Sequence, residues 1–143
     1  MVGGLVTANY FSVLGLRPLH GRTLIPSDDA AGAPPVMVFT HAYWSRMFGA
    51  DPEIVGKTVK LTTKTVEVVG VLEPGSHYTG SRKPDVFVNY TTNDHYTGAA
   101  MRDARTHRMT NVFARLAPGV TTEAAQAELT QINRRLQDEF SQA

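Results

Sequence analysis

Residues 9–22 have the sequence Asn9-Tyr-Phe-Ser-Val-Leu-Gly-Leu-Arg-Pro-Leu-His-Gly-Arg22, and residues 44–58 continue in the same style with Trp44-Ser-Arg-Met-Phe-Gly-Ala-Asp-Pro-Glu-Ile-Val-Gly-Lys-Thr58. In both stretches glycine or proline interrupts aromatic and aliphatic residues at short intervals, and these two residue types punctuate local structure. The interruptions are Gly15, Pro18, Gly21, Gly49, Pro52 and Gly56. This pattern predicts short buried elements joined by tight turns, which is typical of a structural scaffold and not of a catalytic centre.

The composition is that of an ordinary folded protein. The 143 residues are 42% hydrophobic and 19% charged, enough for one domain or two small subdomains with a real core. A formal net charge of +1 gives no general reason to bind nucleic acid. The absence of cysteine excludes disulfides and thiolate metal sites but leaves the compartment undecided. No apolar run approaches the roughly 20 residues that span a bilayer, and the abrupt start at Met1 suggests a segment of a longer protein.

Periodicity and capping signals predict the order of elements. Thr40 is expected to cap a helix that Gly49 ends, and Trp44, Met47 and Phe48 are expected to share its core-facing side. A second, longer helix is expected from Thr121 or Thr122 to about Phe140, with an amphipathic stripe of apolar residues. The stripe consists of Ala125, Leu129, Ile132, Leu136 and Phe140. A short helical turn is expected over residues 9–14, and strands are expected over residues 4–7, 36–39, 59–61, 65–72, 85–90 and 111–116.

Several catalytic or ligand-binding interpretations fail on spacing. Gly56-Lys57-Thr58 lacks the first glycine of a phosphate-binding loop, because position 51 is Asp51, so a glycine turn before a strand is expected instead. The five histidines form no local metal-binding pair, and Asp28-Asp29 is expected to be a solvated loop or the cap of a short helix. Ser76 and His77, with Asp85 or Asp94, would need a shared cleft to act as a hydrolase. No catalytic, metal or cofactor site is therefore expected.

The segment 76–108 is the candidate for contact with a partner. It is polar, rich in turn residues and long for a connection within a compact domain, and such loops are often functional. A solvated connector is the alternative interpretation for its basic part. The candidate contact residues are His77, Tyr78, Arg82, Arg102, Arg105 and Arg108.

The same motifs resemble a known family. In order, residues 9–22, 36–44, 48–58, 66–75 and 115–129 are similar to conserved segments of the MacB-like periplasmic core domain of FtsX-type permeases of ABC transporters. Their style is closest to the large duplicated permeases of soil bacteria. The residues that carry the family motif are Asn9, Tyr10, Phe11, Gly15, Pro18, Gly21, Arg22, Trp44, Phe48, Gly49, Gly56 and Gly70.

The resemblance implies an α+β, two-lobed extracytoplasmic domain of an inner-membrane protein, with a small mixed sheet, short helices and a strand-turn-long-helix unit. Residues 1–92 would form an inserted mixed α/β lobe, 93–108 a connector, and 109–143 part of a porter-like lobe. Such a domain is not an enzyme and needs no cofactor. Its partners would be the membrane helices and nucleotide-binding domain of the same transporter, and a periplasmic adaptor protein.

The resemblance also implies a function, namely coupling cytoplasmic ATP hydrolysis to extracytoplasmic movement in an efflux or export permease. An extracytoplasmic module that binds or senses a small ligand is the alternative. A deep apolar pocket with a few convergent polar groups would favour the alternative.

Overall fold

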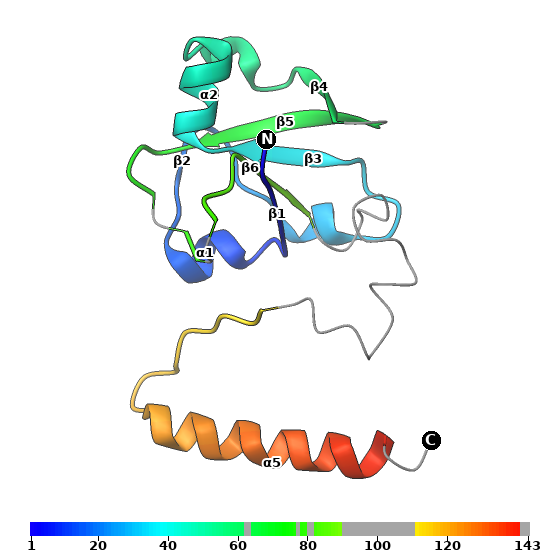
Figure 1. Cartoon of the computed structure of the whole chain (residues 1–143), viewed down its shortest axis with the longest axis vertical. Coiled ribbons are helices and arrows are strands. Elements are labelled where there is room, and N and C mark those ends of the chain that lie inside the picture. The colour runs from blue at the N-terminus through cyan, green and yellow to red at the C-terminus, as the bar shows by residue number, and fades with distance from the viewer. Residues whose placement is uncertain (62–63, 77, 80–81, 90–110, 141–143) are drawn as a thin grey trace. The chain divides into compact units, whose positions relative to one another are not determined.

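The structure is a computed structural model of the chain, and it describes residues 1–61, 64–76, 78–79, 82–89 and 111–140. The chain divides into two compact units, Met1–Asn111 and Val112–Ala143 (Figure 1).

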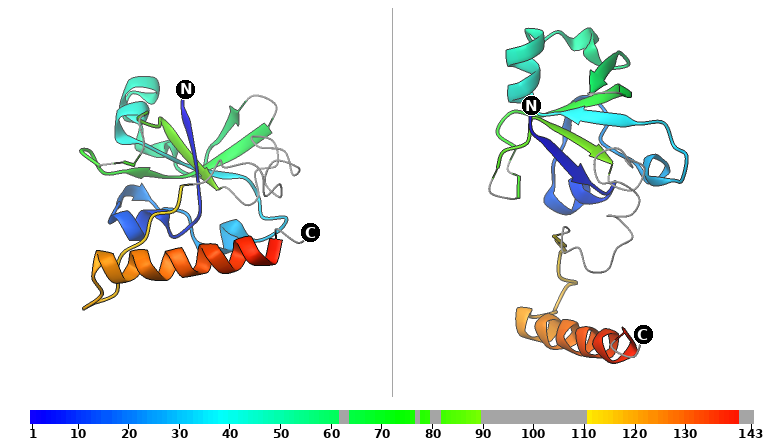
Figure 2. Two further views of the ribbon diagram at one scale, coloured as in Figure 1. Left: turned by 60° about the horizontal axis from the view of Figure 1, so that its bottom comes forward. Right: turned by 45° about the vertical axis from the view of Figure 1, so that its right-hand side comes forward.

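The first unit is built on a six-stranded mixed sheet (Figures 1 and 2). Its strands are β1 (Gly3–Val6), β2 (Pro18–Gly21), β3 (Val36–Phe39), β4 (Thr58–Leu61), β5 (Lys64–Leu72) and β6 (Val86–Asn89). The strand order is β1-β6-β3-β5-β2, and β4 pairs with β5 outside this path. β1 runs parallel to β6 and β3 parallel to β5, whereas the other pairs are antiparallel. The expected small mixed sheet is thereby confirmed.

Short helices cover the two faces of this sheet. On one face α1 (Tyr10–Leu14) contributes Phe11 to a cluster with Val38 and Phe87. On the other face α2 (His41–Phe48) contributes Tyr43 and Trp44 to a second cluster. β3 and β6 lie between the two layers, and all of their residues are buried. Strands that are apolar on both faces are typical of sheets covered on both sides.

β5 contributes side chains to both clusters and carries a register shift against β3. Met37 of β3 pairs with Val68, and Val38 pairs with Gly70, so Val69 is an extra residue in β5. Val68 belongs to the α2 cluster, whereas Val69 belongs to the α1 cluster. An extra residue of this kind is a β-bulge, which bends a strand and re-aims its side chains.

Local signals explain how α2 begins and ends. The Tyr43 N–H donates to Thr40 Oγ1 at 3.3 Å, and Gly49 follows the helix with φ +59°. Both predicted caps are confirmed. The predicted apolar face is correct for Trp44 and partly for Phe48, which packs against the core. It is wrong for Met47, which is 57% exposed, because Tyr43 occupies the buried side instead.

The other predicted elements of this unit fall within a residue or two of those observed. The strands predicted at residues 59–61 and 65–72 form the antiparallel pair β4–β5, and the residues between them, 62–63, lie outside the described residues. The predicted helical turn at residues 9–14 begins one residue later, at Tyr10, and the side chain of the preceding Asn9 accepts a hydrogen bond from the Thr7 hydroxyl and does not cap the helix. Two elements were not predicted, namely β2 and the 3-10 turn η2 (Pro52–Ile54). A further 3-10 turn, η1 (Pro26–Asp29), occupies part of the predicted polar loop.

The second unit consists mainly of the helix α5 (Thr122–Phe140), which confirms the predicted long helix. The Ala124 N–H donates to Thr121 Oγ1 at 3.2 Å, so Thr121 caps its first turn. The predicted strand at residues 111–116 is wrong, since no strand is formed there. The alternation of Val112, Ala114 and Leu116 suits a strand, but a strand also needs a neighbour to pair with.

Candidate interaction surface

The loop between β5 and β6 carries the first part of the predicted contact segment. The Tyr78 ring packs against Phe87 with centroids 5.4 Å apart, and the Tyr10 and Thr79 hydroxyls lie 3.1 Å apart. Burial raises the pKa of the Tyr78 hydroxyl. The ring of Tyr78 therefore covers the α1 cluster and anchors the loop to the sheet.

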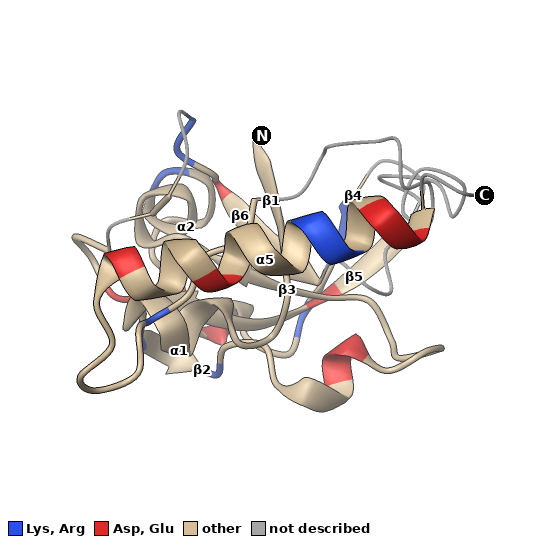
Figure 3. Cartoon of the chain, turned by 90° about the horizontal axis from the view of Figure 1, so that it is seen from below, with Lys and Arg blue, Asp and Glu red and all other residues tan. Residues whose placement is uncertain are grey.

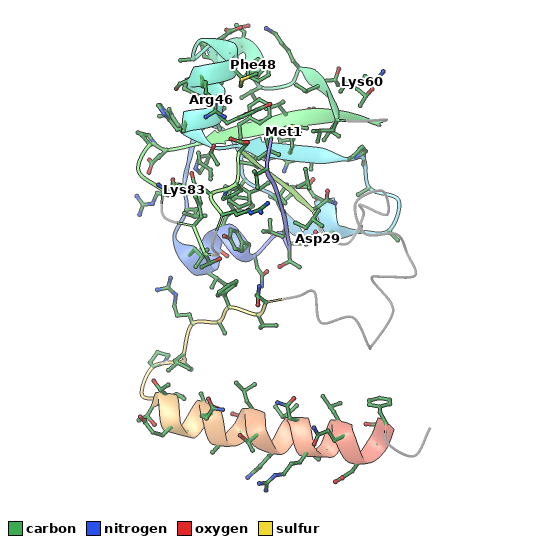
Figure 4. The ribbon with its side chains drawn as sticks, viewed as in Figure 1. Met1, Asp29, Arg46, Phe48, Lys60 and Lys83 are labelled. Carbon is green, nitrogen blue, oxygen red and sulfur yellow. The ribbon has the colours of Figure 1, made fainter. Side chains whose placement is uncertain are left out.

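Asp85 organises the end of the same loop. Its Oδ1 accepts a hydrogen bond from Arg46 Nη2 at 2.9 Å, and its Oδ2 accepts one from the Val2 N–H at 2.8 Å. Its backbone carbonyl accepts hydrogen bonds from the Thr40 N–H and hydroxyl. Burial alone raises the pKa of Asp85, but the bonds from Val2 and Arg46 outweigh burial and hold that pKa below its usual value. Asp85 thus joins the starts of β1, β6 and α2, and it pairs with Arg46 and with the amino group of Met1, two residues that are labelled in Figure 4.

Of the six predicted contact residues, Tyr78 and Arg82 lie within the described residues. Arg82 is exposed, and Lys83 lies beside it in the same loop (Figure 4). Figure 3 shows basic and acidic residues interspersed over the first unit. Four of the six predicted contact residues lie outside the described residues, namely His77, Arg102, Arg105 and Arg108.

The structure also shows where the residues considered for a phosphate-binding loop, a hydrolase site and a metal site lie. Gly56 forms a turn with φ +85° two residues before β4 begins at Thr58, which confirms the prediction of a glycine turn. The Ser76 hydroxyl donates to the Glu73 carbonyl at 2.7 Å, and Asp85 is engaged by Arg46 and Val2. His77 and Asp94 lie outside the described residues. In the described part of the chain, no three His, Asp or Glu side chains form a group that could hold a metal ion.

A partly buried polar network around η1 was not predicted from the sequence. Arg22 donates from Nη1 and Nη2 to the two carboxylate oxygens of Asp28, at 2.6 and 3.1 Å. Asp28 is only 7% exposed, whereas it was expected to be a solvated loop residue or a helix cap. It is also a cap, because its Oδ2 accepts a hydrogen bond from the Ile25 N–H at 2.8 Å. The available signal was an arginine that closes the family motif six residues before an acidic pair.

The second unit presents an apolar surface on α5. Leu129, Leu136 and Phe140 are all exposed, and α5 has no buried residue. Along α5, acidic residues flank a pair of basic residues (Figure 3). In the described residues, no helix has both the length and the apolar character needed to cross a membrane.

Comparison with known structures supports the fold. The periplasmic region of MacB from Actinobacillus actinomycetemcomitans matches with a TM-score of 0.63 at 20% identity, over 94% of this chain and 56% of that one. A domain of a permease protein from Porphyromonas gingivalis matches with a TM-score of 0.61 at 18% identity, over 96% and 60% respectively. The extracellular domain of the noncanonic ABC-type transporter YknZ from Gram-positive bacteria gives 0.52 at 23% identity, over 64% and 44%. The chain thus spans about half the length of these structures.

Comparison of sequences gives the family. No curated protein sequence matches the chain. The model of the MacB-like periplasmic core domain matches residues 1–132, which is most of the 143 residues. The chain therefore belongs to the family of MacB-like periplasmic core domains.

Proposed function

We propose that this chain is a non-catalytic periplasmic domain of an ABC-type efflux or export permease, which couples cytoplasmic ATP hydrolysis to movement outside the membrane. The family match over residues 1–132 carries the proposal, because such domains belong to transporter permeases. The domain acts through protein contacts and rigid-body movement. Its partners are the membrane helices and nucleotide-binding domain of the same transporter, together with a periplasmic adaptor protein.

The packing of the first unit supports a rigid-body role. Its sheet is covered on both faces, and the largest fully buried side chains come from both layers of the core. Protein interiors packed in this way are nearly as dense as organic crystals, so they transmit strain with little deformation. A unit of this kind moves as one body when force is applied to its ends.

Coupling is tested by measuring distance changes in the complete permease. Spin labels are placed on Lys60 of β4 and Thr130 of α5, which are both exposed and lie in different units. Because this chain contains no cysteine, a cysteine introduced at each position labels this domain specifically in an otherwise cysteine-free permease. We expect the distance distribution to differ between the nucleotide-free and ATP-bound permease. An identical distribution in both states would contradict coupling.

Partner contact is tested with matched charge variants. The first variant replaces four predicted contact residues with alanine, and the control removes four positive charges elsewhere. The contact variant changes Arg82, Arg102, Arg105 and Arg108; the control changes Lys57, Lys60, Arg134 and Arg135. Crosslinking in membranes followed by mass spectrometry should show a protein partner that only the contact variant loses, with ATPase activity retained. If no partner is lost and a small molecule raises the Tm of the chain instead, the ligand-sensing alternative is correct.

A further inference from the structure

The C-terminal ends of β1 and β6 lie side by side in the first unit. The two strands are parallel, and their last pair is Val6 with Asn89. Val6 leads into the turn before α1, and Asn89 is the last residue of β6. A contact that joins these two strand ends fixes the position of Val6 relative to Asn89 at this end of the sheet.

The turn η1 bridges both ends through two consecutive residues. The Asp28 carbonyl accepts a hydrogen bond from Asn89 Nδ2 at 2.6 Å, across 61 positions of sequence. The Asp29 carboxylate accepts one from the Ala8 N–H at 2.7 Å. Asp29, labelled in Figure 4, therefore lies at the end of β1, while its neighbour binds the end of β6.

The same turn is anchored on β5 by Arg22. The guanidinium forms a two-point ion pair with Asp28, and the Arg22 N–H donates to the Val69 carbonyl at 2.8 Å. Planar two-point pairs of this kind restrict orientation as well as distance. The backbone of Arg22 also lies directly against Gly70, so residues 21–22 and β5 are in close contact.

We infer that residues 22–29 form a clasp, which locks the C-terminal ends of β1 and β6 to β5 so that the first unit moves as one body. The inference rests on the proposed function, because rigidity matters only to a domain that transmits movement. Asn89 is held in the clasp by a single side-chain hydrogen bond. Its side chain is fully buried, and in the described part of the chain its Oδ1 has no hydrogen-bond partner, so one bond through Nδ2 holds it to η1.

Amide hydrogen exchange of the 143-residue chain tests the clasp directly. The variant Asn89→Leu keeps a similar side-chain size and removes the bond to Asp28. If the clasp acts as a unit, exchange of the Ala8 and Ile25 amides should accelerate about tenfold, which corresponds to about 1.4 kcal/mol. Neither amide is bonded to Asn89. The Tyr43 amide, bonded to Thr40 beyond the clasp, should stay within twofold of wild type.

A matched pair of carboxylate variants provides a second test that does not depend on Asn89. Asp28→Asn removes the charge that binds Arg22, and Asp51→Asn is its control. Both aspartates accept a backbone N–H at a 3-10 turn and pair with a cation, but Asp51 is outside the clasp. Asp28→Asn should accelerate exchange of the Ala8 amide, whereas Asp51→Asn should affect only its own turn.

Two results of the exchange experiment would overturn the clasp. In the first, Ala8 keeps its wild-type rate in both Asn89→Leu and Asp28→Asn, which means that the bond from Ala8 to Asp29 is independent of the contacts that Asp28 makes with Asn89 and Arg22. In the second, Tyr43 accelerates as much as Ala8, which means that the variants weaken the whole unit and no local coupling exists.

The spin-labelled permease separates failure of the clasp from failure of the proposed function. With Asn89→Leu, the ATP-dependent distance change between residues 60 and 130 should be reduced at least twofold, with ATPase activity retained. If the wild type shows the change and the variant shows it undiminished, the clasp is not needed for transmission and the inference is wrong. If the wild type itself shows no change, the proposed coupling fails first.

Discussion

Replacing Gly70 with alanine tests the close contact between β5 and residues 21–22. A Cβ at this position would collide with the Arg22 backbone carbonyl and amide nitrogen, and not with the end of a flexible side chain. Backbone atoms cannot rotate away, so the two segments must separate. Overpacking of this kind costs about 1–3 kcal/mol, and loss of the bond from the Arg22 N–H to Val69 adds about 1 kcal/mol.

The expected loss is therefore about 3 kcal/mol in the free energy of unfolding. For a unit of this size, this corresponds to a decrease in Tm of about 12 °C. Urea unfolding followed by tryptophan fluorescence measures this loss in the free energy of unfolding. Trp44 reports on the first unit because it is the single tryptophan and lies buried there.

Gly3→Ala is the matched control for this experiment. Gly3 also lies in a strand without positive φ, but nothing lies within 4 Å of the position of its Cβ. The control should change stability by no more than about 1 kcal/mol, and it can be stabilising because alanine restricts the unfolded chain. Ordinary surface substitutions change the free energy of unfolding by about 0.5 kcal/mol or less. If the free energies of unfolding of Gly70→Ala and Gly3→Ala differ by no more than about this amount, the close contact is not the reason for glycine at position 70.

Three further predictions concern the core of the first unit, the hydrogen bonds of Asp85 and the long helix α5. Phe11→Ala should cost about 3–5 kcal/mol in urea unfolding, whereas Met47→Ala should cost under about 0.5 kcal/mol, because Phe11 is buried and Met47 is exposed. Asp85→Asn should cost about 1–2 kcal/mol at pH 7 and little at pH 2. The depressed pKa of Asp85 means that its contribution is complete above about pH 4 and is lost as the pH falls further. Thr121→Ala should destabilise α5 by about 1 kcal/mol, measured as lost helical signal in far-UV circular dichroism.

Each of these predictions has a specific contradicting result. Equal costs for Phe11→Ala and Met47→Ala would mean that the burial pattern of the first unit is wrong. A difference between Asp85→Asn and wild type that is the same at pH 2 and pH 7 would show that the ionised carboxylate contributes nothing. Thr121→Ser retains the hydroxyl, so a helical signal as low as that of Thr121→Ala would exclude the cap as the cause.

Much of the first unit is predictable because its signals are local. Thr40 and Gly49 bracket α2 by their own backbone and side-chain chemistry, and the apolar run at residues 36–39 has room for only one buried strand. The turn at Gly56 was predicted on the same basis. These features depend on residues a few positions apart, which a sequence displays directly.

Other features could not be predicted because they depend on distant pairing. β2 contains Pro18 and Gly21, which are poor strand formers, and it becomes a strand only because β5 provides hydrogen-bond partners. Residues 111–116 show the reverse case. Their alternating pattern favours a strand, yet a pattern without a paired neighbour does not produce one.

The candidate contact segment also has features that the sequence indicated and features that only tertiary contacts show. Polarity and length indicated the segment 76–108, but they could not show that Tyr78 packs on Phe87 and serves the core as well. Nor could they show that Asp85 ties three elements together through Arg46 and Val2.

The sequence by itself indicated the family, and it determined the caps of α2, the turn at Gly56 and the apolar strands of the first unit, because these features depend on sterics and hydrogen bonds between near neighbours. Only the tertiary structure decided which buried polar groups meet. Asp28 and Asn89 are 61 positions apart, and the Arg22 backbone requires glycine at position 70 because it lies where a Cβ of residue 70 would be. Such contacts follow from strand order and register, which bring distant residues together and leave no local pattern in the chain.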